Sequence, residues 1–497
     1  MRDVFPQALL KALAVDSGTP AFEHGGRLLS RRGLLDLIAR FTGGLRAAGL
    51  GPGTGVALST AVTPEGFAAQ LAAHVLGCRV VVVPPGPNPA QLAHLLDGVE
   101  VLLADETATP GLLAAAPRVL PVGPALLGAA ETPVPRGEPG AIATVVYTSG
   151  STGNPKGTEF THAAQAARWS WHPTTWTGDV LALAERYRRF LLFGTLASAV
   201  MQEHLGLCLF SGGTAVIPEA PPVFPDVLAE LRISAALLTA PRFYHLLDTV
   251  SGRDIDLSAA RMLMVAGSPV APHRLAQGYR VLGDVLHHGY GQTETGMLAL
   301  QTAENVAKWP ETLTSVGRPW AHGELQIRDE DGRPVPAGTA GEIWARTANI
   351  LTGYRNDPRE SAEVLRNGWV RTRDVGQFDA RGFLYLTGRS REVVIVNAAI
   401  HYLGPIERAL ASHPDVDQAY VVAAPDERTG EAAHAFVVAS AGNEPDPGAL
   451  RRLVARRLGE AAVPATITVV ERVPIGPSGK PDKHALLATM ARSSGRR

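Results

Sequence analysis

Apolar residues recur along the chain at two spacings, and each spacing predicts a different element. Between residues 30 and 49 they return every three or four positions as far as Gly49, a pattern typical of an amphipathic helix that ends at a glycine. The short apolar runs 55–59 and 79–83 predict strands, and residues 67–76 between them predict a second helix. Because strands and helices alternate at this interval, the sequence predicts a parallel sheet covered by helices on both faces.

Another apolar run, 141–146, leads into a loop of small polar residues. The run predicts a buried strand, and the loop reads Tyr147-Thr148-Ser149-Gly150-Ser151-Thr152-Gly153-Asn154-Pro155-Lys156-Gly157. Its three glycines leave the backbone free to turn N–H groups toward an anion, four hydroxyl side chains add donors, and Lys156 supplies a cation. These are the properties of a phosphate-binding loop, although many loops of this composition are plain turns.

The distribution of lysine favours the phosphate-binding interpretation. Only five of the 46 basic residues are lysine, at positions 11, 156, 308, 480 and 483, and the other 41 are arginine. Lysine is a compact point charge that the planar guanidinium group does not reproduce. Its retention in two loops rich in glycine and proline therefore indicates that Lys156 and Lys480 have a chemical role. The loop lacks the Gly-Lys-Ser/Thr ending of a Walker motif, which disfavours a P-loop kinase or ATPase.

Length and composition narrow the class of protein. A chain of 497 residues is too long for one hydrophobic core and is expected to form at least two domains. With 46 basic and 47 acidic residues, it has no general field to attract nucleic acid or an anionic membrane. Its two cysteines, Cys78 and Cys208, are too few for a disulfide framework or a cysteine metal cluster. With no apolar signal core or run long enough to span a membrane, we expect a cytoplasmic protein that acts on a small molecule.

Two further strands, predicted at 261–265 and 285–288, end in segments suited to a nucleotide. The first runs into Ala266-Gly267-Ser268-Pro269 and the second into Gly289-Tyr290-Gly291-Gln292-Thr293-Glu294. Small residues after the first strand let a flat ring approach the backbone, and Tyr290 offers an opposing face. The two segments together are expected to hold an adenine ring.

The last part of the chain, 392–497, has the pattern of a small α+β unit. Strands are predicted at 393–396, 418–424 and 434–439, and helices at 405–412 and 447–458. Near its end lies Pro474-Ile475-Gly476-Pro477-Ser478-Gly479-Lys480-Pro481-Asp482-Lys483, the second lysine-bearing loop.

The loop at 147–157, the segment 289–294 and the lysine loop at 474–483 together resemble the adenylate-forming superfamily of acyl- and aryl-CoA synthetases, adenylation domains and luciferases. The resemblance covers nearly the whole chain. It implies an α/β fold in which a large N-terminal AMP-binding domain (1–389) contains stacked α/β subdomains and a distorted barrel. A small, mobile C-terminal α+β lid domain (390–497) is expected to rotate at a hinge near Arg391, where family members usually carry aspartate or lysine.

The resemblance also implies roles around the phosphates. In similar family members the threonine at Thr293 binds the α-phosphate, and the glutamate at Glu294 ligates Mg²⁺, a hard cation that suits carboxylate oxygen. Lys480 is expected to bridge the acid's carboxylate and the α-phosphate and so to stabilise the charge that develops between them. Lys156 and its loop are expected to hold the β- and γ-phosphates. The expected catalytic residues are therefore Lys480, Thr293, Glu294 and Lys156.

The remaining expected contacts are to the ribose. Asp374 resembles the family residue that accepts both ribose hydroxyls, and Arg389 resembles one that contacts ribose and phosphate. In the family, the segment 191–209 lines the acyl pocket. The complete expected ATP site consists of Thr148, Ser149, Gly150, Ser151, Thr152, Gly153, Lys156, Gly267, Ser268, Pro269, Tyr290, Gly291, Gln292, Thr293, Asp374, Arg389 and Lys480.

The activity implied by the resemblance has two steps. ATP activates a small aryl or acyl carboxylic acid as acyl-AMP with release of pyrophosphate, and the acyl group then passes to a thiol, either of CoA or of a carrier protein's phosphopantetheine. In thioester-forming relatives a glycine pair lets the phosphopantetheine arm pass, and here that pair is Asn397-Ala398. This departure motivates an alternative, a ligase of natural-product biosynthesis whose acceptor is an amine or nitrite. A non-catalytic nucleotide-binding protein is disfavoured, because the chain retains Lys156, Glu294, Asp374 and Lys480 together.

One aromatic cluster has two interpretations. Trp169, Trp171 and Trp176 are three of the seven tryptophans in the chain and lie within eight residues of one another. Packing of the rings onto a core explains most clusters of this kind. The alternative is a lid near the mouth of the substrate pocket.

Overall fold

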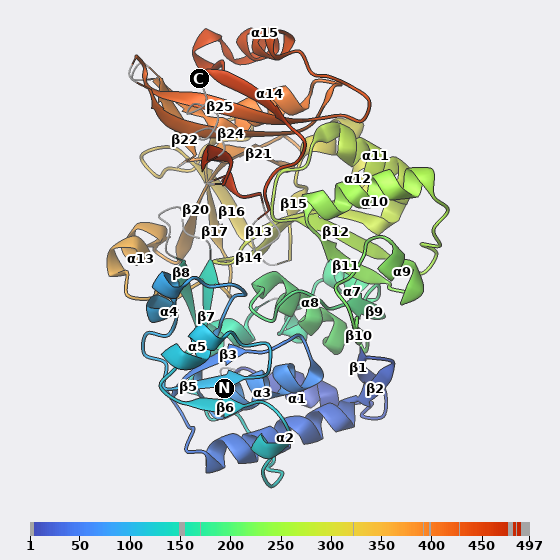
Figure 1. The fold of residues 1–497 in the computed structure, drawn as a ribbon, viewed down its shortest axis with the longest axis vertical. Coiled ribbons are helices and arrows are strands. Elements are labelled where there is room, and N and C mark those ends of the chain that lie inside the picture. Colours follow the sequence, from blue (N-terminus) through green and yellow to red (C-terminus); the bar gives the residue numbers. More distant parts are fainter. Residues whose placement is uncertain are drawn as a thin grey trace.

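The computed structural model describes residues 4–148, 155–168, 170–321, 323–390, 392–396, 399–426, 428–475, 481–483 and 485–488. Over these residues the chain forms four β-sheets with helices packed around them. Figure 1 shows the seven-stranded sheet toward one end of the long axis and the C-terminal sheet at the other, with the β1 and β2 end of the nine-stranded sheet beside the seven-stranded one. The mixed α/β architecture, with a large N-terminal part and a small C-terminal one, agrees with the fold class predicted from the sequence. None of the described helices is both long and apolar enough to cross a membrane.

The seven-stranded sheet has the strand order β18-β8-β7-β4-β3-β5-β6. Its strands are β3 Gly55–Ser59, β4 Arg79–Val82, β5 Val101–Ala104, β6 Val119–Pro121, β7 Ile142–Thr148, β8 Lys156–Thr161 and β18 Gly353–Tyr354. The five strands from β7 to β6 pair in parallel, as predicted, whereas β8 and β18 add an antiparallel edge. Helices α2 Arg31–Ala47, α3 Pro64–Val75, α4 Pro89–Leu95, α5 Pro110–Ala115 and α6 His162–Ala166 and the short helix η1 Pro124–Leu126 accompany it.

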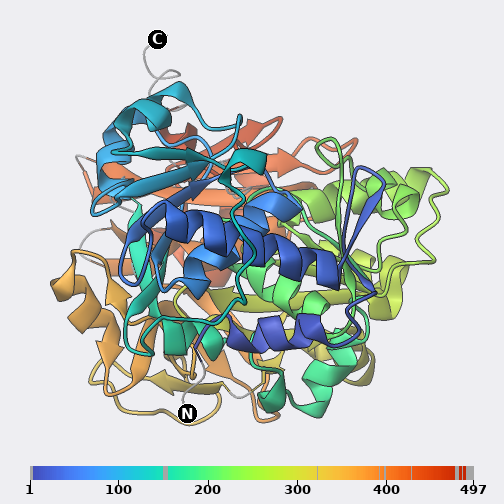
Figure 2. The ribbon, with the colours of Figure 1, turned by 90° about the horizontal axis from the view of Figure 1, so that it is seen from below.

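The predicted helix near residue 30 begins where its sequence provides a cap. Ser30 accepts a hydrogen bond from the Gly33 backbone N–H through its side chain, which satisfies one of the free N–H groups at the start of α2. The buried face of α2 carries Leu34, Ile38 and Phe41, none of which is exposed. Seen from below, the N-terminal helices, drawn in blue, lie across the near side of the molecule (Figure 2).

The nine-stranded sheet has the order β15-β14-β13-β12-β11-β9-β10-β1-β2. Its strands are β1 Pro20–His24, β2 Arg27–Ser30, β9 Arg189–Leu191, β10 Thr214–Ile217, β11 Ala235–Leu238, β12 Met262–Ala266, β13 Leu286–Gln292, β14 Gly296–Thr302 and β15 Arg318–Pro319. Around it lie α1 Gln7–Ala14, α7 Gly178–Ala184, α8 Ala199–Phe210, α9 Asp226–Glu230, α10 Ala240–Gly252, α11 Pro272–Leu282, α12 Ala303–Lys308, η2 Pro173–Thr175, η3 Gly283–Val285 and η4 Pro310–Thr314. Strand β13 continues through the glycines at 289 and 291, four residues beyond the predicted end at His288.

A separate antiparallel sheet lies between this part of the chain and the C-terminal part, and its strand order is that of an open sheet. It contains β16 Glu324–Arg328, β17 Gly341–Arg346, β19 Leu365–Arg366, β20 Trp369–Phe378 and β21 Leu384–Arg389, with the helix α13 Pro358–Val364 beside it. Residues along β20 alternate in burial, and Thr372 and Asp374 lie on its buried face. This alternation turns the Asp374 carboxylate toward β13.

The C-terminal sheet has the order β23-β22-β25-β24, and β26 pairs with β25. Its strands are β22 Val393–Val396, β23 Ala399–Tyr402, β24 Val416–Asp426, β25 Gly430–Ala439 and β26 Thr466–Val470. Helices α14 Leu403–Ala411 and α15 Pro447–Leu458 and the short η5 Glu460–Ala462 complete the unit. The strands and helices that the sequence predicts here are therefore confirmed, with shifts of at most two residues at every end except the start of β25, which lies four residues earlier than predicted.

Candidate active site

The Asp374 carboxylate, at the junction of the sheets, accepts hydrogen bonds from three side chains. Its Oδ2 accepts hydrogen bonds from the Tyr290 hydroxyl at 2.7 Å and from Gln292 Nε2 at 2.6 Å. Its Oδ1 accepts one from Arg389 Nε at 2.9 Å. These three donors fix the orientation of the carboxylate, whose two oxygens offer about four acceptor positions. Tyr290, Gln292 and Arg389, all predicted for the nucleotide site, thus contact Asp374, which was predicted for the same site.

The hydrogen bonds to Asp374 also set the charge states of two of its donors. Burial, reinforced by the neighbouring Asp374 charge, raises the pKa of Tyr290 well above its ordinary value, so the phenol stays protonated and donates. Burial alone would lower the pKa of Arg389, but the charges of Asp374 and Glu392 outweigh it and raise that pKa. The arginine therefore stays fully charged beside the carboxylate.

The predicted adenine-binding segments lie on neighbouring strands. Ala266, at the end of β12, pairs with Gly289 of β13, so the segments that follow these two positions start side by side. Gly267 has a positive φ of 88°, which a glycine adopts without strain. The turn that contains Gly267, Ser268 and Pro269 lies at least partly in solvent, whereas Tyr290 is 8% exposed and packs in an apolar cluster. Contact of adenine with these groups stays a prediction.

The segment predicted to bind phosphate connects two antiparallel strands. Strands β7 and β8 pair in an antiparallel manner up to Thr148 and Lys156, which are partners in register. Ser149, Gly150, Ser151, Thr152 and Gly153, and the side chain of Thr148, lie outside the described residues. The stems are held by α4, because the Tyr147 hydroxyl donates to the His94 carbonyl at 3.0 Å and a His94 ring nitrogen lies 2.9 Å from the Pro155 carbonyl.

Lys156 lies within a group of charges that the sequence did not reveal. Its ammonium pairs with Glu360 and lies 5.4 Å from the centre of the Tyr354 ring. Glu360 also accepts a hydrogen bond from Arg373, whose second nitrogen lies 3.0 Å from Glu363. The hydrogen bond from Arg373, together with Lys156, lowers the pKa of Glu360 despite its burial. The side chain therefore stays ionised between two cations.

Thr293 and Glu294 occupy the short turn between β13 and β14. The Tyr354 hydroxyl donates to Glu294 Oε1 at 2.9 Å, and burial together with this carboxylate raises the pKa of Tyr354. Among the described residues no group of three or more histidine, cysteine, aspartate or glutamate side chains could hold a metal by itself. A single carboxylate nevertheless fits Mg²⁺, which proteins commonly bind through one or two carboxylates together with substrate phosphates. Glu294 would hold the ion here.

Tyr354 links these two groups, and sequence reasoning did not identify its role. Its ring faces Lys156 and its hydroxyl binds Glu294, although it lies far from both in the chain. Strand β18 places it there by pairing with β8, where Tyr354 is the partner of Thr158. A two-residue strand has no periodic signal, so the sequence offered no sign of this pairing.

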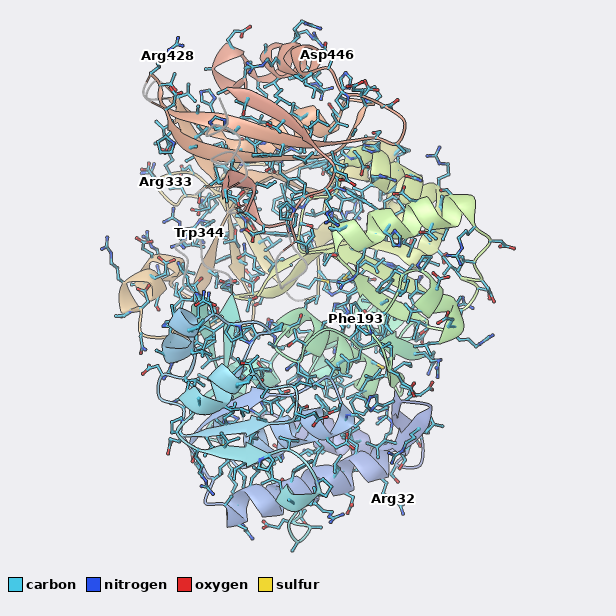
Figure 3. All side chains as sticks on the ribbon, viewed as in Figure 1. Arg32, Phe193, Arg333, Trp344, Arg428 and Asp446 are labelled. Atoms are coloured by element: carbon cyan, nitrogen blue, oxygen red, sulfur yellow. The ribbon has the colours of Figure 1, made fainter. Side chains whose placement is uncertain are left out.

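Two cavities adjoin the segment predicted to line the acyl pocket. One has a volume of about 270 Å³ and is lined by Gly194, Thr195, residues 58–61 and residues 82–87, among others. The other, of about 20 Å³, is lined by residues that include Leu196, Ala197, Ala199 and Gln202 together with Thr144, Gln165, Arg168 and Trp171. Phe193, labelled in Figure 3, is 8% exposed and packs against Phe224 at a ring distance of 5.6 Å.

Arg168 and Glu203 form a buried ion pair beside the smaller cavity. Their side chains are each 3% exposed, and the Glu203 carboxylate accepts from Arg168 Nε at 2.7 Å. Trp171 is 1% exposed and meets Phe5 and Phe210 edge to face at ring distances of 5.2 and 6.2 Å. Its position favours the packing interpretation of the tryptophan cluster over a lid, while Trp169 lies outside the described residues.

The two most consequential C-terminal predictions also fall outside the described residues. These are the predicted hinge residue Arg391 and the predicted catalytic residue Lys480. The pair Asn397-Ala398 also lies outside the described residues. On either side of the Lys480 loop, Ile475 and Pro481 form an isolated antiparallel bridge.

Comparison with known proteins shows the family. The sequence profile of "AMP-binding enzyme" matches residues 10–355, and that of "AMP-binding enzyme C-terminal domain" matches residues 405–480. A feruloyl-CoA synthase from Amycolatopsis is 31% identical over 93% of this chain and 94% of its own length. A medium/long-chain-fatty-acid–CoA ligase, FadD8, from Mycobacterium tuberculosis is 28% identical over 98% of this chain and 90% of its own.

A solved structure is similar over almost its full length. It is the amide bond synthetase McbA from Marinactinospora thermotolerans, which is 32% identical, covers 97% of this chain and 99% of its own, and has a TM-score of 0.85. The profile matches and the two ligase relatives indicate an AMP-binding ligase, and the similarity to this structure agrees with them. The chain belongs to the AMP-binding enzyme family and is an AMP-forming ligase of the adenylate-forming superfamily.

Proposed function

We propose that this enzyme activates a small carboxylic acid with ATP and passes the acyl group to a thiol. In the first step a carboxylate oxygen forms a bond to the α-phosphorus, the bond from that phosphorus to the bridging oxygen breaks, and pyrophosphate leaves with the electron pair. The observation that carries the proposal is the convergence of Tyr290, Gln292 and Arg389 on the buried Asp374 carboxylate. A fixed two-oxygen acceptor at the ends of β13, β20 and β21 suits the two hydroxyls of a ribose.

In this proposal, different residues of the site bind different parts of the ATP molecule. Asp374 and Arg389 hold the ribose, Thr293 faces the α-phosphate, and the hairpin turn with Lys156 holds the β- and γ-phosphates. Mg²⁺, held by Glu294, supplies charge neutralisation when bound. Phosphoryl chemistry of this kind needs little covalent help from a protein, so the contribution of these residues is positioning and electrostatic stabilisation.

Lys480 is the proposed catalytic cation. It bridges the acid's carboxylate and the α-phosphate while the C-terminal domain, residues 390–497, is closed over the N-terminal domain, residues 1–389. Rotation at the hinge near Arg391 then removes Lys480 and admits the acceptor, a domain movement that separates the two half-reactions.

The thiol acceptor is CoA or the phosphopantetheine of a carrier protein. Support comes from the relatives, because the 31% identical protein is a feruloyl-CoA synthase and FadD8 is a fatty-acid–CoA ligase. A second candidate acceptor is an amine, which would give an amide. The likeness to the amide bond synthetase, at 32% identity, and the pair Asn397-Ala398 in place of two glycines favour it.

Carboxylate-dependent exchange of pyrophosphate into ATP tests the first step. A panel of aryl and aliphatic acids should contain at least one that supports exchange, and failure of every acid in a broad panel would overturn the proposal. Lys480→Ala should abolish exchange while ATP still binds, and Lys308→Ala, on the exposed end of α12, is the matched lysine control. Unchanged exchange in Lys480→Ala would refute the role of Lys480.

A separate measurement identifies the acceptor. Preformed acyl-adenylate is mixed with CoA, a holo carrier protein, a set of amines or nitrite, and the product is identified by mass. A thioester supports the proposal, whereas an amide formed in the absence of any thioester supports the second candidate.

A further inference from the structure

Lys483 lies between two carboxylates, three residues beyond Lys480. Its Nζ is 2.8 Å from Glu392 Oε2 and 3.0 Å from Glu407 Oε1. Glu392 directly follows Arg391, the proposed hinge residue, and Glu407 lies on α14. One ammonium group therefore connects the chain just after the lysine loop with the chain just after the hinge.

The acceptor on α14 is itself held in place. The Glu407 side chain is 13% exposed, and its Oε1 also accepts a hydrogen bond from the Val421 backbone N–H at 2.9 Å. Burial lowers the pKa of Lys483, but the charges of Glu407 and Glu392 outweigh this effect and raise it overall. The ammonium group is thus charged at neutral pH and its position is tied to β24.

The chain near Lys483 is the base of the loop that carries Lys480. Ile475 and Pro481 form a β-bridge, and the Asp482 N–H donates to the Pro474 carbonyl at 2.8 Å. Beyond the base, Leu486 is 1% exposed and packs with Val422, Phe436 and Val473. A shift of Lys483 would therefore move the base of the loop, and with it the reach of Lys480.

The contacts continue from Lys483 to the nucleotide site. Glu392 Oε1 is 3.9 Å from Arg389 Nη1, and Arg389 Nε donates to Asp374 Oδ1 at 2.9 Å. Charges alternate along this row of Lys483, Glu392, Arg389 and Asp374. The row begins at the lysine loop, crosses the proposed hinge and ends at the carboxylate proposed to bind ribose.

We propose that Lys483 is a positioning residue for adenylation: by pairing with Glu392 and Glu407 it fixes the base of the Lys480 loop relative to the hinge and to Asp374. The proposal rests on the function proposed above. A merely structural lysine would stabilise the C-terminal unit without any particular effect on one half-reaction. A positioning lysine should affect the step that needs Lys480 and leave both ATP binding and the second half-reaction largely intact.

Kinetics of three variants separate the two roles. Lys483→Met and Glu392→Gln should each lower the kcat of pyrophosphate exchange roughly 10- to 100-fold, the size of effect expected from a small misplacement of a reacting group. The dissociation constant for ATP and the rate of acyl transfer from preformed adenylate should each change less than about threefold. Lys483→Arg, which keeps the charge, should recover part of the loss. Lys308→Met, on an exposed lysine, is the control.

The double variant adds a direct test of the connection. If the two residues act through one contact, Lys483→Met combined with Glu392→Gln should lose little more exchange activity than either alone. An unchanged kcat in Lys483→Met would overturn the proposal. So would an equal loss in exchange and in acyl transfer, because such a loss would indicate general damage to the fold.

A measurement of loop position does not depend on any activity and separates failure of this proposal from failure of the proposed function. Both native cysteines are buried, so a cysteine introduced at Ser478 and another at the exposed Glu304 on α12 can be spin-labelled selectively. Lys483→Met should broaden the distance distribution between the labels, and Lys308→Met should not. An unchanged distribution in Lys483→Met would overturn the positioning role even if the enzyme supported no exchange with any acid tested.

Discussion

Arg274 on α11 donates a hydrogen bond from Nε to Asp417 Oδ1 on β24 at 2.6 Å, and the two residues come from the two separate regions matched by the family profiles. Their side chains are 12% and 10% exposed. Asp248 lies 2.5 Å from Arg274, and His273 lies 3.6 Å from Asp417. Burial lowers the pKa of Arg274, but Asp417 and Asp248 outweigh it and raise that pKa, so the contact is a charged one.

Asp417→Asn is expected to loosen the contact between the two regions. A hydrogen bond to a charged group contributes about 1.5–3 kcal/mol, so the arrangement seen here should lose roughly a tenfold to hundredfold preference over alternative orientations. The distance between fluorescent labels on the two regions measures this change. Asp415→Asn, a change within the C-terminal unit, should leave the distance unaltered, and an unaltered distance in Asp417→Asn would show that the pair does not hold the regions together.

The same pair predicts a pH dependence. Burial raises the pKa of Asp417, but hydrogen bonds from His273 and Arg274 and the charge of Arg274 outweigh this effect and lower the pKa below its ordinary 3.8. For an acid with a lowered pKa, the stabilisation is present above the unfolded value and disappears as the pH falls through the folded value. The label distance should therefore stay constant from neutral pH down to about pH 4 and change only below it. A change between pH 6 and 8 would indicate that another group controls the contact.

Asp374→Asn should weaken ATP binding and the junction of the sheets at once. An amide NH₂ group would face at least one of the three donors, leaving it without an acceptor, at a cost of about 1–3 kcal/mol. We expect the KM for ATP to rise about tenfold or more. The free energy of unfolding should fall by about 1–3 kcal/mol. Urea unfolding and exchange kinetics measure both. Asp331→Asn, beside the exposed Arg333 labelled in Figure 3, is a control in the turn between β16 and β17, and equal effects of the two substitutions would contradict the prediction.

The strands were predictable wherever burial on both sides produced a continuous apolar run. The predicted strand 55–59 has the same bounds as β3, because every residue of β3 except the last is buried. The predicted strand 285–288 ends at His288, although β13 continues through residues 289–292. Its glycines are needed there for another reason: a Cβ on Gly291 would lie 2.5 Å from the Gly296 carbonyl oxygen of β14. Close approach of two backbones and a flexible loop both select glycine, so the sequence cannot separate them.

Motifs predicted the residues that the structure gathers around Asp374, but not the charges around Lys156. Glu360 lies 204 residues from Lys156, and no local pattern connects them. Arg373 has a positive φ of 62°, uncommon for a residue other than glycine, and the sequence of a regular strand gives no sign of it. Side chains brought together by sheet pairing are the part of the site that needs the structure.

Glu360→Gln should remove part of the stability of the protein at neutral pH. The carboxylate is 11% exposed and pairs with both Arg373 and Lys156, so its removal leaves two cations without their shared partner, at a cost of about 1–3 kcal/mol. Because the pKa of Glu360 is lowered from 4.5, the wild-type stabilisation is present above about pH 4.5 and is lost as the pH falls. Urea unfolding at pH 7 and at pH 3 should show a difference between variant and wild type that shrinks in acid. Glu311→Gln, in the exposed pair with Arg381, should show little difference at either pH.

Glu203→Gln should be among the more destabilising substitutions in the N-terminal part, although it changes few atoms. Glu203 and Arg168 are each 3% exposed, and removal of one member of a buried pair leaves the other charge without compensation, which costs about 3–5 kcal/mol. The double substitution Arg168→Met with Glu203→Leu removes both charges and should cost less than Glu203→Gln alone. Urea unfolding of the single and double variants measures the coupling. Glu324→Gln, in the exposed pair with Arg346, should change stability by less than about 1 kcal/mol. If Glu203→Gln were equally mild, water would have to reach the Arg168 guanidinium, and the site beside the smaller cavity would be wetter than its burial indicates.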